Sequence, residues 1–377
     1  MNHISDFGSL GGVQTYLCSL GSIDNSNKLF SFKKSLDIYN KRKIIRNIYD
    51  LNNARLLLFD TSIIHNLILS KKWIFYNLIF SLLRKKIIYY EHGVAWHNPI
   101  RNKTTYVKRL NRVDTIIVNS FATKKLLQEI YKIKKNIRVL NIPVCLFEEI
   151  GKKNMNLDTK KYEFANFKNI KSIYIGFLGR LEKHKNPNFL IKLSNLLQDK
   201  YGLKIKLEFI GDGSEYQYLL KESKKYNLDV KFWGAKRNKR IIVDKWHFAI
   251  VPSIREPLGL VQAEMTLMNT LCFSSNIDGI PEMYPNNCNF LKIKLIKEKN
   301  IIDENTNYQF LPNKKCFDKN YVPMVSDCAE KIIELVNNTS KAKKLLNYHR
   351  NFINQNFDIR NHNRNLKEII YGSKTYK

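Results

Sequence analysis

The sequence predicts an α/β protein made of two doubly wound domains. Three observations predict it. Each half of the chain alternates strand-length apolar runs with amphipathic, helix-like stretches. A polar segment without apolar periodicity separates the two halves. Glycine and charged residues directly follow several of the predicted strands, which is where parallel sheets bind ligands. With 377 residues, 44% of them hydrophobic, the chain can bury two domain-sized cores.

In the N-terminal half, four runs rich in Ile, Val and Leu predict strands. A helix-like stretch begins at Ser120, whose hydroxyl can cap the first amides of SFATKKLLQEIY. The predicted strands are RLLLFDTS (55–62), KIIYYEHG (86–93), DTIIVNS (114–120) and NIRVLNIPV (136–144).

The most apolar segment is WIFYNLIFSLL, residues 73–83, which lies between KK and RKK. Its 11 residues are too few to span a bilayer. We expect a buried core helix, with a helix lying in a lipid interface as the alternative.

The segment 151–170 is polar and predicts the linker between the domains. We therefore expect an N-terminal domain over 1–165, a second domain over 166–345, and terminal helices over 346–377 of which the last packs back on the first domain. Helical patterns in the second half cover about 187–200, 214–226, 257–268 and the tail from 327 to 372. Its predicted strands are SIYIGFLG (172–179), KIKLEFIGDG (204–213), VKFWG (230–234), HFAIVPS (247–253), TLCFSS (270–275) and NCNFL (287–291).

The chain is strongly basic, with 64 Lys and Arg against 33 Asp and Glu and a net charge of +31. The charge is spread over both halves, so it indicates an anionic partner without saying which one, and a solvated basic surface explains it equally well. The N-terminus lacks the basic and apolar stretches of a secretory signal, so a cytoplasmic location is expected.

Two acids stand eight positions apart after the strand HFAIVPS. Pro257 suits the first position of a helix, so Glu256 is expected at the strand end and Glu264 roughly 12 Å further along that helix. Free amides at a helix start attract phosphate, and this order suits a ligand with a sugar, a diphosphate and a ribose. A helix with an acidic cap and a buried Glu explains the spacing too. The amides between the two carboxylates would belong to Leu258, Gly259 and Leu260.

A second group of candidate ligand-binding residues lies in GFLGRLEKHKN, at the end of the strand at 172–179. Gly179 permits a close backbone approach, and Arg180 with Lys185 could bring two positive charges to an anion. Chance pairs of this kind are common in so basic a chain, but the position after a strand favours an anion site.

The N-terminal half offers a glycine turn and a histidine at strand ends. Gly11 and Gly12 precede a helix-like run, which suits a phosphate near the helix amides or a plain tight turn. His92, in EHGVAWH, could donate to a sugar hydroxyl or manage a proton near neutral pH, although an isolated His is more often structural. His97 is regarded as incidental.

In their order along the chain, these motifs resemble glycosyltransferase family 4, the GT-B group of retaining nucleotide-sugar transferases among the group 1 glycosyltransferases. The resemblance covers nearly the whole chain and implies a GT-B fold, two Rossmann-like domains facing a central cleft. The chain departs from the family at Leu258, where Phe is common, and at Asn269, where a Gly is usual. The motifs are GG near the start, EHG, GRLEKHKN, IGDGSE, PSIREPLGLVQAE and DGIPE.

The resemblance implies roles for the matching residues of the second half. Glu256 would hold hydroxyls of the transferred sugar, and Glu264 the nucleotide ribose. Arg180 and Lys185 would hold the diphosphate. Gly179 and the amides of 258–260 would complete the donor site.

For the first half, the resemblance implies that Gly11 and Gly12 let their loop approach the phosphates and that His92 contacts the sugar at the reacting face. The departing diphosphate would be stabilised by cations and helix amides, with no cofactor and no metal site assigned.

The implied reaction is retaining hexosyl transfer from a UDP- or GDP-linked sugar to a glycan or lipid-linked acceptor. In a bacterium it would serve surface polysaccharide or lipopolysaccharide biosynthesis, in the cytoplasm or peripherally at the inner membrane, where basic residues could meet anionic lipid. A nucleotide-sugar 2-epimerase of the same fold is the alternative enzyme. A basic nucleic-acid-binding protein is a weaker alternative, because no recognition motif is visible and no nucleic-acid partner is expected.

Overall fold

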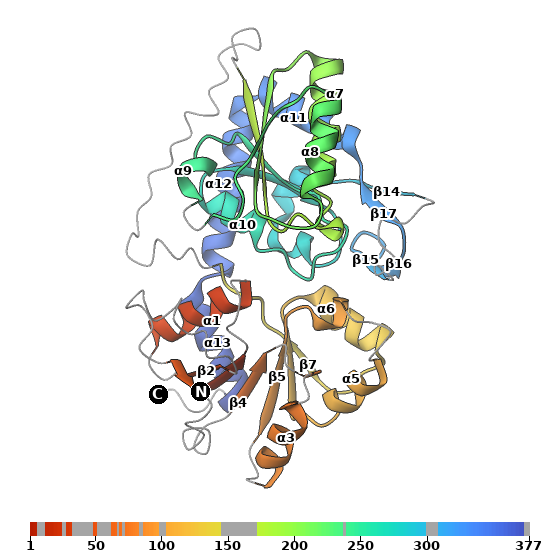
Figure 1. Cartoon of the computed structure of the whole chain (residues 1–377). Coiled ribbons are helices and arrows are strands. Elements are labelled where there is room, and N and C mark those ends of the chain that lie inside the picture. Colours follow the sequence, from red (N-terminus) through yellow and green to blue (C-terminus); the bar gives the residue numbers. More distant parts are fainter. Residues whose placement is uncertain are drawn as a thin grey trace. The chain divides into compact units, whose positions relative to one another are not determined.

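A computed structural model shows two compact α/β units (Figure 1). Unit 1 comprises Met1–Gly151 and Asn356–Lys377, and unit 2 comprises Lys152–Gln355. The predicted linker lies outside the described residues, and the boundary predicted at 346 falls inside a continuous helix, α12 (Thr339–Asn356). The structure describes residues 1–5, 12–24, 28–31, 48–50, 62–65, 68–69, 72–82, 86–97, 103–144, 172–236, 239–298 and 308–372.

In the described part of unit 1, seven strands form one parallel sheet in the order β3-β2-β1-β4-β5-β6-β7. The strand order reverses between β1 and β4. The predicted strands at 86–93, 114–120 and 136–144 are confirmed as β5, β6 and β7, whereas 55–62 lies outside the described residues except Ser62, where β4 begins. The strands are β1 (Asn2–Ser5), β2 (Lys28–Ser31), β3 (Ile48–Asp50), β4 (Ser62–His65), β5 (Ile87–Glu91), β6 (Thr115–Val118) and β7 (Ile137–Val139).

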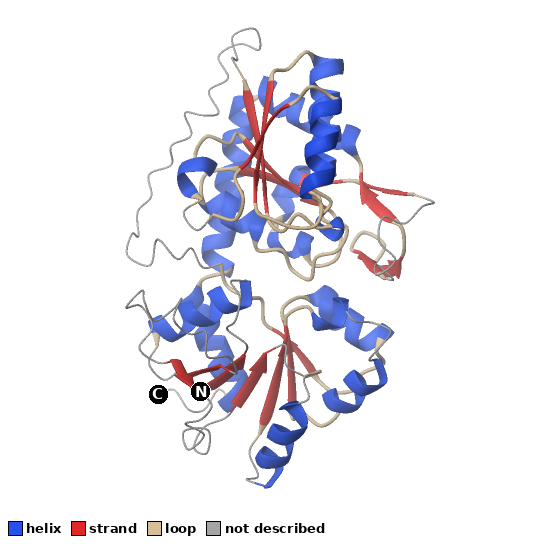
Figure 2. Cartoon of the chain, in the orientation of Figure 1, coloured by secondary structure: helices blue, strands red, loops and turns tan. Residues whose placement is uncertain are grey.

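Helices connect these strands and cover the sheet (Figure 2). The Ser120 Oγ accepts a hydrogen bond of 3.0 Å from the Thr123 N–H, which confirms the predicted cap of α6. The last helix, α13, belongs to unit 1, where the Tyr16 hydroxyl of α1 lies 2.8 Å from His362 Nε2. The helices are α1 (Gly12–Ile23), α3 (Lys72–Leu82), α4 (Val94–His97), α5 (Lys103–Leu110), α6 (Phe121–Lys125), which continues as a π-helix over Leu126–Ile130, and α13 (Ile359–Tyr371).

Helix α3 is not buried on all sides, so the expectation of a fully buried core helix is wrong. Trp73 is 3% exposed, but Ile74, Leu78 and Leu82 are 60%, 58% and 75% exposed. These three residues recur every fourth position and therefore share one helix face. None of the described helices is long and apolar enough to cross a bilayer.

Unit 2 contains a parallel sheet in the order β10-β9-β8-β11-β12-β13, so its strand order reverses between β8 and β11. The strand predicted over NCNFL is wrong, because Asn286–Leu291 forms a 3₁₀ helix behind Pro285. Asn and Pro favour turns over strands. The strands are β8 (Ile173–Leu178), β9 (Ile205–Ile210), β10 (Asp229–Phe232), β11 (Phe248–Val251), β12 (Leu271–Ser275) and β13 (Lys292–Ile293).

Helices α7 and α8 lie on one face of this sheet and α10 on the other (Figure 1). Trp246 is fully buried and donates to Glu208 Oε2 at 2.7 Å. A Cβ at Gly176 of β8 would lie 2.0 Å from the Trp246 ring, so glycine makes room for it. The helices are α7 (Asn188–Tyr201), α8 (Tyr216–Lys225), α9 (Arg240–Val243), α10 (Val261–Leu267), α11 (Val325–Asn337) and α12.

Two short antiparallel pairs follow β13 along the chain, and each forms a two-stranded sheet of its own. β14 (Leu295–Lys297) pairs with β17 (Tyr321–Pro323), and β15 (Gln309–Leu311) pairs with β16 (Cys316–Asp318). The sequence patterns did not predict these two strand pairs.

Candidate functional site

In unit 1, a chain of buried histidines runs from His3 within β1 to His65 and His92 at the carboxyl ends of β4 and β5. His3 Nδ1 is 3.1 Å from His65 Nε2, and His65 Nδ1 is 2.8 Å from His92 Nε2. His92 also stacks on Tyr90 with ring centroids 4.3 Å apart. The His predicted from EHG is therefore held in a hydrogen-bonded row of rings.

Burial keeps His92 neutral. It lowers the pKa of His92 to about 3, with a further contribution from nearby His362. The expectation that His92 manages a proton near neutral pH is therefore wrong, because desolvation disfavours the imidazolium form. A neutral ring can still exchange a hydrogen bond with a sugar hydroxyl.

Glu91 fixes the backbone around His92, and the sequence analysis did not single it out. Its Oε1 accepts from the Gly93 N–H at 2.6 Å and from the Ala95 N–H at 3.1 Å. Its Oε2 accepts from the Tyr89 and Tyr106 hydroxyls at 2.6 and 2.5 Å. The sequence signal that could have identified Glu91 is its position directly before His92 and Gly93.

The glycine turn can be placed only in part. Gly12 is the first residue of α1, and Gly11 lies outside the described residues. His97 ends the short helix α4.

In unit 2, the loops after β8 and β11 meet at the reversal of strand order. Lys185, in the 3₁₀ helix Lys183–Lys185, forms a hydrogen-bonded ion pair with Glu256. Their side chains are 20% and 14% exposed, and the Ile254 N–H donates to the His184 carbonyl at 2.9 Å. The structure therefore brings together a cation and an acid predicted from two separate motifs.

Glycines let the neighbouring loops close on this point. Gly179 has φ +149°, and its N–H donates to the Ile210 carbonyl at 3.0 Å. A Cβ at Gly211 would lie 1.8 Å from the Gly179 carbonyl oxygen, so no side chain fits there. The GDG turn after β9 thus packs directly on the loop that carries Lys185.

The predicted helix over 257–268 begins four residues late, at Val261. Gly259 adopts φ +81°, which a helix does not allow, and residues 257–260 form a turn instead. Glu256 and Glu264 therefore do not lie along one coil as expected. The turn nevertheless leaves backbone N–H groups without a hydrogen-bond partner in the described part of unit 2, those of Leu258, Gly259 and Leu260.

Glu264 lies in the first turn of α10 and forms a hydrogen-bonded ion pair with Lys239, just before α9. The two side chains are 19% and 26% exposed. Sequence reasoning missed Lys239, which is one of many lysines and stands 25 positions away.

Arg180 does not join this cluster in the structure. Its guanidinium lies 2.6 Å from Glu182 Oε1, and its side chain is 60% exposed. Arg180 pairs instead with Glu182, which lies two positions later in the same loop.

Asp278 is the second missed residue of unit 2, although it lies within DGIPE. Its Oδ2 accepts from the Glu256 N–H at 2.9 Å, and its Oδ1 accepts from the Phe310 N–H at 2.8 Å. Arg255 Nε lies 3.7 Å away. Burial raises the pKa of Asp278 to about 7 despite these partners. Asp278 thus fixes the backbone of Glu256.

A comparison with protein families finds a match that includes this part of the chain. Residues 158–302 match the profile of the family described as glycosyl transferases group 1. This segment is a group 1 glycosyltransferase domain. The match covers the loops that carry Lys185, Glu256 and Asp278, and it covers helix α10 with Glu264.

Solved structures similar to the whole chain share its fold, which is GT-B. HepE from Anabaena, in complex with UDP and glucose, is 15% identical, with 98% of each chain covered and a TM-score of 0.68. A glycosyltransferase from Rickettsia africae is 18% identical over 99% of this chain and 98% of its own, with a TM-score of 0.69. The lipopolysaccharide outer core galactosyltransferase WaaB is 14% identical over 98% of each chain, with a TM-score of 0.62. A search among curated proteins finds no match.

In the described parts of the glycosyltransferase domain and of the rest of the chain, no three His, Cys, Asp or Glu side chains are grouped as metal ligands would be. The charged groups that the domain gathers at its strand ends are instead the ion pairs Lys185–Glu256 and Lys239–Glu264.

Proposed function

We propose that the protein is a retaining, metal-independent glycosyltransferase that moves a hexosyl group from a UDP- or GDP-linked sugar to a glycan or lipid-linked acceptor. The observation that carries this proposal is the ion pair between Lys185 and Glu256 at the strand-order reversal of the glycosyltransferase domain. Ligands of doubly wound sheets bind at such reversals. The group 1 family match supports the reaction class.

Lys185 supplies the positive charge that the departing diphosphate needs. In the absence of a donor its ammonium is neutralised by Glu256, so a bound diphosphate would take the place of a carboxylate. Arg180 is exposed enough to turn from Glu182 toward the same anion. Fixed cations at a developing negative charge lower the barrier without a metal ion.

Glu256 and the turn after it provide the other donor contacts. Once Lys185 moves to phosphate, the Glu256 carboxylate can accept hydrogen bonds from sugar hydroxyls. The N–H groups of 258–260 can donate to phosphate oxygens, because the turn leaves them without a partner among the described residues of unit 2. Glu264 is proposed to hold the ribose, with Lys239 orienting its carboxylate.

The roles of unit 1 stay predictions. His92 is assigned to a hydrogen bond with the transferred sugar as a neutral ring, and Gly11 and Gly12 to a close approach of their loop to phosphate.

A role in surface polysaccharide or lipopolysaccharide biosynthesis is supported by fold similarity to a lipopolysaccharide galactosyltransferase. The UDP and glucose in the similar HepE complex support a nucleotide-sugar donor of this kind. The site of action is proposed to be the cytoplasm and its membrane face.

Helix α3 supports peripheral membrane binding. Its exposed stripe of Ile74, Leu78 and Leu82 has no described cover, and lysines and arginines flank the helix at 71–72 and 84–86. Apolar side chains between clustered cations are the composition of a helix that lies in an anionic lipid interface.

Proton NMR of nucleotide sugars incubated with the protein tests the proposed reaction. We expect donor consumption that requires an acceptor, with the anomeric configuration of the donor kept in the product. A thermal-shift panel of nucleotide sugars first identifies the donor, because a ligand that binds only the folded state raises its stability. Conversion of a donor to its epimer without acceptor would instead show the 2-epimerase.

A further inference from the structure

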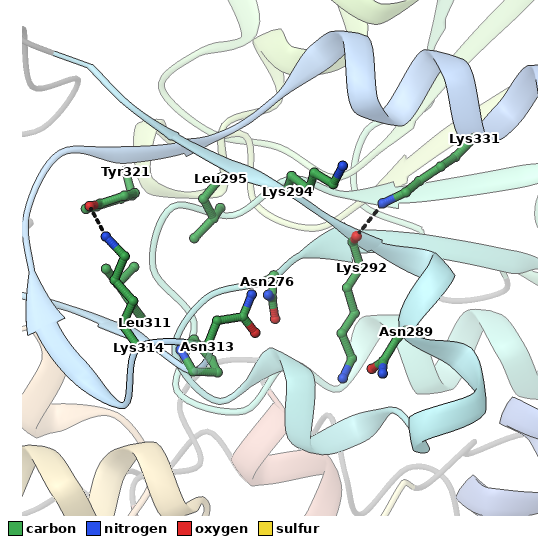
Figure 3. A pocket seen from close by; sticks show the side chains of 11 residues that line it. Asn276, Asn289, Lys292, Lys294, Leu295, Leu311, Asn313, Lys314, Tyr321 and Lys331 are labelled. Carbon is green, nitrogen blue, oxygen red and sulfur yellow. Dashed lines mark hydrogen bonds between the residues drawn. The ribbon is translucent and has the colours of Figure 1, made fainter.

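A cavity of about 480 Å³ lies in unit 2 beside the sheet edge at β13 (Figure 3). The 3₁₀ helix before β13 and the paired strands after it form its walls. None of the residues assigned above to the donor lines it. Its volume lies in the range of sites that hold small molecules.

The walls are cationic. Of the described residues that line the cavity, four are lysines and none is acidic. Lys331 and Lys294 share one carboxylate outside the lining, Asp327, at 2.7 and 3.7 Å. Lys292 and Lys314 have no carboxylate partner in the described part of unit 2.

Lys292 is a cation of the wall that has no carboxylate partner in the described part of unit 2. Its side chain is half-buried and runs along the cavity beside Asn289 (Figure 3). Burial lowers the pKa of Lys292, because desolvation opposes its charge and no carboxylate in the described part of unit 2 offsets it. An anion in the cavity would offset that cost.

The remaining lining suits a sugar ring. Asn276, Asn289 and Asn313 bring side-chain amides, each with two donors and an acceptor. Sugar hydroxyls both donate and accept, so amides satisfy them better than ammonium groups alone. Tyr321, whose hydroxyl lies 3.3 Å from Lys314 Nζ, and Leu295 supply apolar surface for the ring's C–H groups.

We propose that this cavity binds an anionic sugar residue, a pyranose that carries a phosphate or a carboxylate group. Lys292 and Lys314 hold the anion, and the asparagine amides hold the ring hydroxyls. The site goes beyond the transfer reaction, because it shares no residue with the assigned donor site and binding requires no donor.

Isothermal titration of the full-length protein without nucleotide sugar tests this site. The probes are a hexose 6-phosphate, a hexuronate, the neutral hexose and inorganic phosphate. We expect at least one of the two anionic sugars to bind about tenfold or more tightly than both the neutral hexose and phosphate, because only it uses lysines and amides together. The anionic sugar that binds more tightly shows whether the site prefers a phosphate or a carboxylate group.

Lys292→Gln should weaken that binding about tenfold or more through loss of a charge-assisted hydrogen bond. Lys314→Gln, at an exposed position, tests the same point should Lys292→Gln fail to fold. Asn313→Ala should weaken the anionic sugar more than inorganic phosphate. The control Lys192→Gln, exposed on α7, removes the same charge elsewhere and should leave affinity unchanged.

Three results would overturn the proposal. Inorganic phosphate binding as tightly as the anionic sugars would show a plain anion site. Equal affinities of the wild type, Lys292→Gln and Lys314→Gln would place the ligand elsewhere. Displacement of the sugar by UDP would place it in the donor site. A negative transfer assay leaves the proposal intact, since no donor is present.

Discussion

At the scale of single residues, Asp278 connects the donor loop to the strand pair β15-β16. Both of its oxygens accept backbone N–H groups, one from Glu256 and one from Phe310. The carboxyl group of Asp278 is buried, so water does not take its place as the acceptor of these N–H groups when the side chain is removed. The position of Glu256 therefore depends on a residue that is not itself assigned to a ligand.

Asp278→Ala should destabilise unit 2 by about 1–3 kcal/mol for each N–H left buried and unpaired. Asp278→Asn keeps one oxygen acceptor and should cost less. Chemical denaturation measures both, and Asp244→Asn on the surface is the matched control. Equal stability of Asp278→Ala and the wild type would contradict the assigned role.

The same residue predicts a pH effect. The pKa of Asp278 is about 7 in the folded state and about 3.9 when unfolded. Between these values the folded state binds the extra proton, so this group's contribution to stability falls as pH rises from about 4 to about 7. Asp278→Asn does not titrate there. Its stability deficit relative to the wild type should therefore shrink between pH 5 and pH 8, and a constant deficit would count against a raised pKa.

The sequence predicted Lys185 and Glu256 because both directly follow strands, and position after a strand is visible in the pattern. It missed Asp278 and Lys239 because their partners come from distant segments. Phe310 lies in a strand pair with no motif of its own, and Lys239 is one basic residue among 64. The partner of an ion pair also depends on side-chain conformation. The sequence therefore predicted that Arg180 binds an anion, but it could not predict that Arg180 pairs with Glu182.

At the scale of elements, the buried histidines tie β1, β4, β5 and α13 together in unit 1. Burial lowers the pKa of His65, and it lowers that of His362 to about 4. These rings are neutral in the folded state and take up protons when unfolded, below a pKa of about 6.5. Their contribution to stability is therefore complete above about pH 6.5 and is lost as pH falls toward 4.

Unit 1 should lose about 1.4 kcal/mol per pH unit for each such histidine between about pH 6 and pH 4. His362→Gln removes one titrating ring, so its stability should fall less steeply with acid than that of the wild type. Amide hydrogen exchange in β4 and β5 measures the stability of unit 1 as a function of pH. Parallel pH profiles for the two proteins would show that His362 is not neutral by burial.

Helix α3 carries a separate prediction. Leu78→Ser should reduce co-sedimentation with vesicles that contain anionic lipid, because a 58% exposed side chain would lose its lipid contact. Ile241→Ser, at a 70% exposed position on α9, is the control and should bind vesicles like the wild type. No vesicle binding by the wild type at low salt would end the membrane proposal.

The order of strands and helices was predictable because apolar periodicity and length separate most of them. The pattern could not fix the start of α10, since the turn at Gly259 still has apolar residues at helical spacing. It also could not show that Ile74, Leu78 and Leu82 of α3 are exposed, because composition does not reveal what covers a helix.

At the scale of the whole molecule, the ordered motifs predicted the GT-B fold although each motif is weak by itself. The fold similarity at 15% identity shows that packing patterns persist where most residues differ. The paired strands between β13 and α11, which form the cavity with Lys292, had no signal in the sequence. Short irregular strands depend on tertiary contacts more than on local pattern.

The most direct test of the account is the turnover number of Lys185→Ala and Arg180→Ala with the donor identified by thermal shift. We predict that each falls about 100-fold or more while the fold is kept, because a cation at the departing diphosphate is lost. Lys192→Ala, the charge control on α7, should retain the wild-type rate. Near-normal rates for both Lys185→Ala and Arg180→Ala would contradict the claim that the strand-order reversal of unit 2 holds the donor diphosphate.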